Sequence, residues 1–226
     1  FSDLLLECMV KIADRAGLPC YLKPEQLPWY RDKSETRALL RKLELPTPGF
    51  RKIPTAVLED PDRKSRLKER LKGLRYPVVS KPLDKYGSRG IYISENLDEL
   101  IEASQKTAEF SDMPEILVEE YNDGYEFNMM TWVLDGQVHV ISIADREKTS
   151  VAKGEIPIST RNVYPSRLMA KVERLATELL QAYIEKTGQK DGALSMQFFW
   201  KPGEGIQVCE IAARFFGYEH ELTDIV

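Results

Sequence analysis

The chain has 226 residues, of which 42% are hydrophobic and 30% are charged, as in an ordinary folded globular protein. Its 32 basic and 36 acidic residues give a formal net charge of −4. This balance excludes collagen, coiled coil and disorder as overall classes, and it lacks the bulk positive charge of a nucleic-acid or anionic-membrane binder. We therefore expect neither nucleic acid nor a membrane as a partner, although a local basic groove stays open.

The cysteines and the hydropathy pattern indicate in which cellular compartment the protein is expected. Cys8, Cys20 and Cys209 are odd in number and match no zinc or CxxC spacing, and the chain has two histidines. Reduced thiols in the cytoplasm are the expected state. No apolar run approaches the roughly 20 residues that a membrane-spanning helix needs.

The elements predicted in chain order first alternate and then become mainly strands. Gly17 and Gly188 are helix stops, the spacing of Asp32 to Glu35 opens a second helix, and Asp135-Gly136 is a hairpin turn. Helices are expected over residues 1–17, 32–43, 61–72, 96–110 and 166–187, and strands over 52–58, 76–82, 91–93, 115–121, 125–134, 137–144, 193–200 and 206–211. This order predicts an α+β fold of two lobes, with a boundary near residues 111–119.

A first cluster of chemical interest is Lys81 at a strand end, followed by the glycine-bearing loop 84–90. An ammonium group neutralises phosphate charge, and glycines let backbone N–H groups approach phosphate oxygens. The order of residues is not that of a Walker A loop. The same segment is also compatible with a solvated hairpin that carries surface charges.

A second cluster is Glu119, Glu120 and Tyr121 at the end of a strand, with Glu126 following shortly after. Backbone groups at such a strand end can face an adenine, and carboxylates can bind ribose hydroxyls. An edge strand carrying solubilising charge remains the alternative.

A third cluster comprises Gln197 and Glu210, on two strands joined by a short Gly/Pro turn, and Arg214 four residues further on. The first two offer the hard oxygen ligands that magnesium prefers, and the arginine could reach a transferring phosphoryl group. Alternate residues on a solvated sheet face would give the same pattern.

The three clusters together, in this order, resemble the ATP-grasp superfamily. The resemblance is strongest to its branch around the carbamoyl-phosphate synthase large chain, biotin carboxylase and bacterial amino-acid ligases. It is carried by Asp32-Lys33, Leu45 to Pro48, Tyr76 to Pro82, Gly87 to Gly90, Val118 to Tyr121, Glu126, Gln197 and Glu210 to Arg214. It implies a fold in which two α+β lobes enclose ATP. The implied divisions are a tail of a preceding α/β domain (1–28), an N-terminal lobe with a phosphate lid (29–114) and a C-terminal lobe that is expected to be truncated (115–226).

The resemblance also implies a role for each site residue. Lys33 and Lys81 would contact ATP phosphates, and the loop around Ser88 and Gly90 would cover the β- and γ-phosphates. Glu119 would contact the adenine amino group, Glu120 and Tyr121 would line the adenine pocket through their backbones, and Glu126 would bind the ribose. Gln197 and Glu210 would hold Mg²⁺ or Mn²⁺, and Arg214 would stabilise the reacting phosphate. Lys81 and Arg214 would be the catalytic residues, and Arg146 and Lys148 are further candidates for phosphate contact.

The implied reaction is an ATP-dependent ligation that joins an acid to an amine through an acyl phosphate. A homodimer is compatible with the resemblance. Two departures from the family pattern bear on this reaction. Ala212 stands where many members carry a metal-binding Asn, and Phe216-Gly217 stands where many carry two glycines. A nucleotide-binding module without ligase activity, or a small-molecule kinase on the same fold, therefore stays open.

Overall fold

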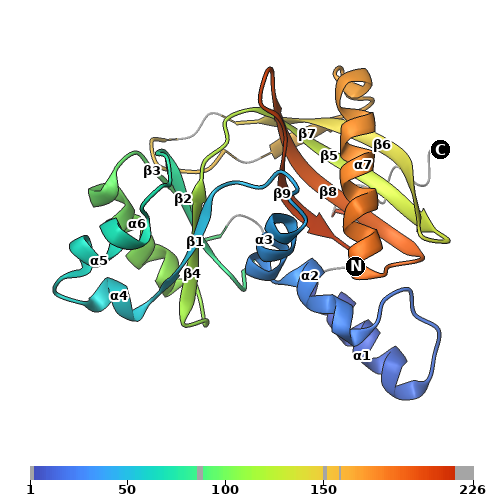
Figure 1. Ribbon diagram of the computed structural model, residues 1–226, viewed down its shortest axis with the longest axis horizontal. Coiled ribbons are helices and arrows are strands. Elements are labelled where there is room, and N and C mark those ends of the chain that lie inside the picture. The colour runs from blue at the N-terminus through green and yellow to red at the C-terminus, as the bar shows by residue number, and fades with distance from the viewer. Residues whose placement is uncertain (1–2, 86–88, 150–151, 158, 217–226) are drawn as a thin grey trace. The chain divides into compact units, whose positions relative to one another are not determined.

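The fold is built on two antiparallel sheets (Figure 1) in a computed structural model that describes residues 3–85, 89–149, 152–157 and 159–216. The helices are α1 (Asp3–Ala16), the 3-10 turn η1 (Pro24–Gln26), α2 (Leu27–Arg31), α3 (Lys33–Lys42), α4 (Ala56–Glu59), α5 (Arg63–Arg70), α6 (Leu97–Glu109) and α7 (Met169–Thr187). The strands are β1 (Phe50–Pro54), β2 (Val78–Pro82), β3 (Tyr92–Ser94), β4 (Glu115–Glu120), β5 (Tyr125–Leu134), β6 (Gln137–Lys148), β7 (Ser159–Val163), β8 (Gly192–Lys201) and β9 (Gly205–Ala212). The predicted α+β class is confirmed.

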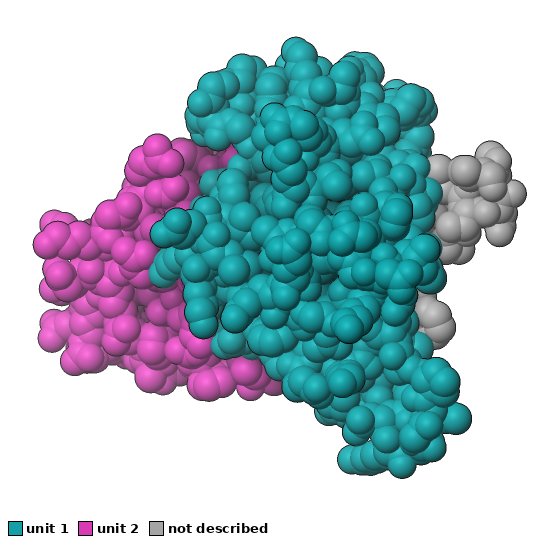
Figure 2. Space-filling view, turned by 45° about the vertical axis from the view of Figure 1, so that its right-hand side comes forward, with its two compact units in different colours: residues 1–47, 124–147, 161–226 teal, residues 48–123, 148–160 magenta. Residues whose placement is uncertain are grey.

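The chain forms two compact units, shown in teal and magenta in Figure 2. Unit 1 comprises residues 1–47, 124–147 and 161–226 and holds the sheet ordered β7-β6-β5-β8-β9. Unit 2 comprises residues 48–123 and 148–160 and holds the sheet ordered β1-β4-β2-β3. These units do not follow the expected lobes 29–114 and 115–226, because β4 pairs with both β1 and β2 inside the sheet of unit 2.

The two faces of the unit 2 sheet differ. Helices α4, α5 and α6 cover one face (Figure 1), where Ile53, Leu67, Leu100 and Ile116 are fully buried. The Oγ of Ser80, on β2, lies 2.8 Å from the Oγ1 of Thr107 on α6, so Ser80 faces the helices. Because side chains alternate along a strand, the neighbouring Lys81 points to the opposite face.

In unit 1 the helix α7 packs along one face of the second sheet (Figure 1). The sheet supplies Phe127 and Phe198, whose rings stack with centroids 5.1 Å apart, and α7 supplies Leu180 and Tyr183. The alternation of β5 then places Glu126 and Asn128 on the other face of the sheet. This polar face is where the predicted metal and ribose residues of unit 1 lie.

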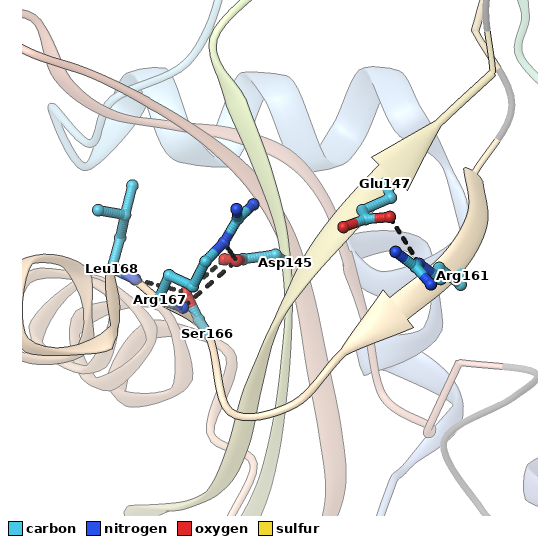
Figure 3. A network of polar contacts seen from close by, with 6 residues as sticks. All are labelled: Asp145, Glu147, Arg161, Ser166, Arg167 and Leu168. Atoms are coloured by element: carbon cyan, nitrogen blue, oxygen red, sulfur yellow. Dashed lines mark hydrogen bonds and ion pairs between the residues drawn. The ribbon is translucent and has the colours of Figure 1, made fainter.

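The start of α7 is fixed to β6 by the network in Figure 3. The Asp145 carboxylate accepts hydrogen bonds from Ser166 Oγ at 2.6 Å and from Arg167 Nε at 2.8 Å and backbone N at 3.3 Å. Ser166 Oγ in turn accepts one from the backbone N–H of Leu168 at 3.1 Å. Burial alone would raise the pKa of the Asp145 carboxyl, but these hydrogen bonds outweigh it and hold the pKa below its usual value.

The structure confirms most predicted elements and adds four among the described residues, namely η1, α2, α4 and β7. The hairpin turn is confirmed, with φ of +51° at Asp135 and +74° at Gly136, as the tight turn requires. The helix α2 lies in the proline-rich connection 18–30, where Pro28 falls in the first turn and so costs no hydrogen bond. The helix α4 replaces the end of the strand expected over 52–58, and β7 was not predicted. Among the described residues, no helix is both long and apolar enough to span a membrane.

Candidate functional site

A β-bulge in β9 sets the orientation of the predicted metal residues. Ile206 and Val208 lie in the core of unit 1, and so do Ile211 and Ala213, so the buried positions change from even to odd numbers. The register shifts at this point, because Gln197 pairs with Glu210 whereas the next residue, Phe198, pairs with Val208. The extra residue is Cys209. It turns Glu210 away from the core onto the polar face.

Gln197 and Glu210 therefore lie opposite each other on that face, as predicted for an oxygen-ligand pair. The Nε2 of Gln197 donates a hydrogen bond to Glu126 Oε1, which leaves the Gln197 Oε1 as the acceptor end of this amide. A hydrogen bond stabilises the bulge, since the buried Arg37 of α3 donates from Nη2 to the carbonyl oxygen of Cys209 at 2.7 Å. The structure thus brings Glu126, Gln197 and Glu210 together.

Glu126 also meets a cation on the same face. Arg146 Nε lies 3.3 Å from Glu126 Oε1, and both side chains are largely buried, with 14% and 7% exposed. Arg146 Nη1 donates to Asn128 Oδ1 at 3.3 Å. A buried carboxylate needs a charged or hydrogen-bonding partner, and Arg146 is that partner for Glu126 beside the predicted metal residues.

Arg214 follows β9 directly and is fixed by its surroundings. Its Nη1 donates to the carbonyl oxygen of Phe215 at 3.1 Å, and its guanidinium lies 5.4 Å from the ring centroid of Phe216. The preceding carbonyl, of Ala213, accepts a hydrogen bond from Tyr21 Oη at 2.7 Å. Burial raises the pKa of Tyr21 to about 12, so its hydroxyl stays protonated and can donate.

Lys33, the remaining predicted site residue of unit 1, is the first residue of α3. The helix begins there because the Asp32 carboxylate accepts from the backbone N–H groups of Ser34 and Glu35, as the sequence predicts for an N-cap. Helix α3 packs against β9, which carries Glu210.

In unit 2, Lys81 and Glu119 form a buried ion pair. Their side chains are 11% and 4% exposed, and Lys81 Nζ donates to Glu119 Oε1. They meet because Glu119 pairs with Val79 in the register of β2 and β4, which puts both on the face away from the helices. A buried pair of this kind adds little stability compared with apolar packing of similar volume.

The backbone N–H groups of Glu120 and Tyr121 are already used inside unit 2. The first donates to Gly49 O and the second to Pro77 O, both at 2.9 Å. Any backbone contact of these residues to a base would therefore use a carbonyl oxygen. The Glu120 side chain binds Arg75, and although burial would raise the pKa of this carboxyl, the hydrogen bonds from Arg75 hold it below the usual value.

The predicted phosphate loop is only partly visible, since Ser88 falls outside the described residues. Gly90 is buried, with φ of +69°, and a Cβ there would lie 2.8 Å from the Cβ of Phe110. Its carbonyl accepts from Thr107 Oγ1 at 2.9 Å. Gly90 is thus a packed anchor at the end of the loop, and a side chain would not fit there. Lys148, the last residue of β6, belongs to unit 2.

The donor set of unit 1 fits a magnesium ion. Gln197 and Glu210 offer an amide and a carboxylate oxygen side by side, and Mg²⁺ is commonly held by one or two such protein ligands together with water and substrate phosphates. Within the described ranges, no three His, Cys, Asp or Glu side chains come together as an all-protein metal cage. The arrangement therefore suits an ion that arrives with a phosphate ligand.

Comparison with known proteins identifies the family. The model of the ATP-grasp domain matches residues 74–221, which is more than half of the chain. The chain belongs to the ATP-grasp family. This confirms the resemblance found in the sequence, and it agrees with the two antiparallel sheets of the fold.

Individual relatives of this ATP-grasp protein are distant. A 5-formaminoimidazole-4-carboxamide ribofuranosyl monophosphate synthetase from Pyrococcus horikoshii is 27% identical over 158 residues, which cover 66% of this chain and 41% of that one. The L-amino acid ligase from Bacillus licheniformis superposes with a TM-score of 0.76 at 24% identity, over 97% of this chain and 49% of that chain. The biotin carboxylase domain of the Hydrogenobacter thermophilus 2-oxoglutarate carboxylase, solved as a dimer with MgADP, ADP and bicarbonate, superposes with a TM-score of 0.73 at 17% identity, over 95% and 46%.

The chain thus spans about half the length of these relatives. Their shared fold supports the ATP-grasp assignment, whereas the carbamoyl-phosphate-synthase-like subtype stays a prediction.

Sequence reasoning missed three residues that shape the site, namely Tyr21, Arg37 and Asn128. The first two act through backbone carbonyls of the C-terminal strand region, 192 and 172 residues away along the chain, so no local motif marks them. Asn128 did carry a signal. It is a polar residue two positions after Glu126 within an otherwise apolar strand, where a polar group needs a partner.

Proposed function

We propose that this chain is the ATP-binding part of a ligase that activates a carboxylate as an acyl phosphate and then joins it to an amine. The observation that supports this best is the pairing of Gln197 with Glu210 on the polar face of unit 1, with Arg214 following on the same stretch of chain. Oxygen ligands for a metal and a nearby guanidinium are what phosphoryl transfer to a carboxylate needs.

In the proposed reaction, a carboxylate oxygen of the acid attacks the γ-phosphorus of ATP, and the bond from that phosphorus to the β-phosphate oxygen breaks, releasing ADP. The amine then attacks the acyl carbon, inorganic phosphate leaves, and the amine proton is lost to solvent or a base. Negative charge builds on the phosphoryl oxygens, and Lys33, Lys81 and Arg214 are proposed to stabilise it.

The remaining roles are proposed by family resemblance. Gln197 and Glu210 would hold Mg²⁺, or Mn²⁺ in its place, and the ion when bound would neutralise phosphate charge. Glu126 would bind the ribose, and Glu119 with the carbonyl groups of Glu120 and Tyr121 would face the adenine. Lys148 and the loop containing Ser88 and Gly90 would lie near the phosphates. A cytoplasmic location and a homodimer belong to the same proposal.

The buried Lys81–Glu119 pair allows a sharp test. Removing Lys81 alone would leave a buried carboxylate without its cation, so a loss of activity could reflect a loss of folding. The double variant Lys81→Met with Glu119→Gln removes both charges and relieves this problem. We expect Lys81→Met to abolish the release of ADP that depends on an acid and an amine, and we expect the double variant to regain stability without regaining activity.

Activity that returns with stability in the double variant would contradict a role for Lys81 in the reaction. Lys52→Met is the matched control, because Lys52 forms an ion pair with Glu115 in the same sheet at a more exposed place, with the side chains 41% and 32% exposed. ADP release should survive that change. The assay uses the full-length protein and a panel of acid and amine pairs.

One observation favours a second candidate, a nucleotide-binding module without ligase activity. Ala212 is buried at 1% exposure two positions after Glu210 on the same strand, and its methyl group offers no oxygen to a second ion. ATP binding without ADP release for any acid and amine pair would support this second reading. A stable phosphorylated product instead of an amide would indicate a kinase.

A further inference from the structure

Asn128 has a hydrogen-bonding group that the rest of the described chain does not satisfy. The residue is 1% exposed, and its side-chain Nδ2 has no hydrogen-bond acceptor among the described residues. A buried N–H group left without an acceptor destabilises the folded state. Such a group inside a site therefore points to an acceptor that arrives with a ligand.

The orientation of the amide is fixed by Arg146. Asn128 Oδ1 accepts from Arg146 Nη1 at 3.3 Å, so the amide oxygen faces the guanidinium and the NH₂ group faces away from it. In the register of the sheet, Asn128 lies between Gln197 on β8 and Ala144 on β6. It is thus directly beside one of the two proposed metal ligands.

Arg146 has donor capacity left as well. Its Nε lies 3.3 Å from Glu126 Oε1 as an ion pair, but this nitrogen is buried and makes no well-aligned hydrogen bond within the described chain. The Glu126 carboxylate is shared, because the Nε2 of Gln197 also donates to Oε1. The groups left over around Asn128 and Arg146 are therefore N–H donors.

N–H donors on neighbouring residues, one of them on a guanidinium, fit anionic oxygens better than neutral ones. The neighbouring Gln197 and Glu210 offer oxygen ligands to a cation, and a phosphate oxygen is the ligand that such a cation shares. We propose that Asn128 Nδ2 and Arg146 bind phosphoryl oxygens of the nucleotide, with Asn128 also positioning the guanidinium. This inference rests on the proposed function for the presence of a nucleotide.

The test compares nucleotide with nucleoside. Binding of ATP, ADP and adenosine to the full chain with Mg²⁺ is measured by calorimetry, without acid or amine, for the wild type, Asn128→Asp, Asn128→Ala and Arg146→Lys. The aspartate keeps the shape of the side chain and replaces the NH₂ donor with a carboxylate oxygen. We expect Asn128→Asp to weaken ATP binding by about tenfold or more, and Asn128→Ala by less, while adenosine binding changes little.

Arg146→Lys retains the charge but loses the planar fork, and it should also weaken ATP binding more than adenosine binding. Gln189→Glu is the matched control, since it is another amide-to-acid change at a buried residue of unit 1, where the amide donates to backbone carbonyls of Asp191 and Ala193. It should lower the melting temperature but leave the ratio of ATP to adenosine affinity unchanged.

Equal losses of ATP and adenosine binding in the Asn128 variants, or no loss at all, would overturn the inference. Because no ligation is measured, its failure is distinct from that of the proposed function. A wild type that binds ATP but never releases ADP would refute the ligase while leaving the Asn128 result standing. ATP binding that Asn128→Asp leaves unchanged, in a protein whose wild type releases ADP, would refute the inference alone.

Discussion

The carboxylate of Asp145 joins the N-terminal end of α7 to β6 through Ser166 and Arg167. We expect Asp145→Ala to lower the free energy of unfolding at neutral pH by about 2 kcal/mol, because the buried Ser166 hydroxyl and the start of α7 lose their acceptor. Denaturant unfolding followed by circular dichroism measures this difference. Arg174→Ala, which removes an exposed ion pair with Glu178 on the same helix, should cost less than about 0.5 kcal/mol.

The contribution of Asp145 should also depend on pH. Its pKa in the folded chain lies below the ordinary value of about 3.9, so the stability it adds is fully present above that value. That stability is lost as the pH falls through the lowered pKa, where the carboxylate becomes protonated. The difference in the free energy of unfolding between the wild type and Asp145→Ala should therefore become smaller below about pH 4. A difference that grows on acidification would contradict a lowered pKa of Asp145.

Single residues also show how far the sequence could predict the site. Glu126, Gln197 and Glu210 were predicted from residue type and position, and the structure brings these three together on one sheet face. The contact of Lys81 with Glu119 was not predicted, since the two were assigned to different parts of a nucleotide. Strand register decides that contact, and register is a property of two distant segments that neither segment encodes alone.

Among the elements, β9 differs most clearly from the regular strand that its local sequence pattern predicts. A regular strand over 206–211 was predicted, but it would have turned Glu210 into the core together with Ile206 and Val208. The bulge at Cys209 reverses this, and its trace in the sequence is the change of the apolar positions from even to odd numbers. That change could have been seen, whereas the support from Arg37 of α3 could not.

The support of this bulge by Arg37 leads to a prediction at the same scale. Arg37→Met keeps much of the buried side chain but removes the donor to the Cys209 carbonyl. We expect the free energy of unfolding to fall by about 2 kcal/mol and the Mg²⁺ dependence of ATP binding to shift to higher Mg²⁺ concentration, because Glu210 loses its fixed orientation. Arg41→Met, on an exposed turn of the same helix, is the control. Unchanged Mg²⁺ dependence in a destabilised Arg37→Met would show that the bulge is purely structural.

The two units place the proposed residues in separate groups, with Lys33, Glu126, Gln197, Glu210 and Arg214 in unit 1 and Lys81, Gly90, Glu119, Glu120, Tyr121 and Lys148 in unit 2. In the proposed reaction, residues around Arg214, where the sequence departs from the common pattern, would contact the acid.

Ligand binding should raise the melting temperature of the whole chain, and the contributions of nucleotide and metal to this rise can be measured separately. A ligand that binds only the folded state at 100 times its dissociation constant stabilises it by about 2.7 kcal/mol. For a chain of this size that corresponds to a rise in Tm of about 5 to 10 °C, measured by scanning calorimetry. We expect ATP with Mg²⁺ to give such a rise and AMP to give little. EDTA should remove most of the gain, because Gln197 and Glu210 would then face the phosphates without a cation between them. A rise that survives EDTA unchanged would show that the oxygen pair does not hold a metal.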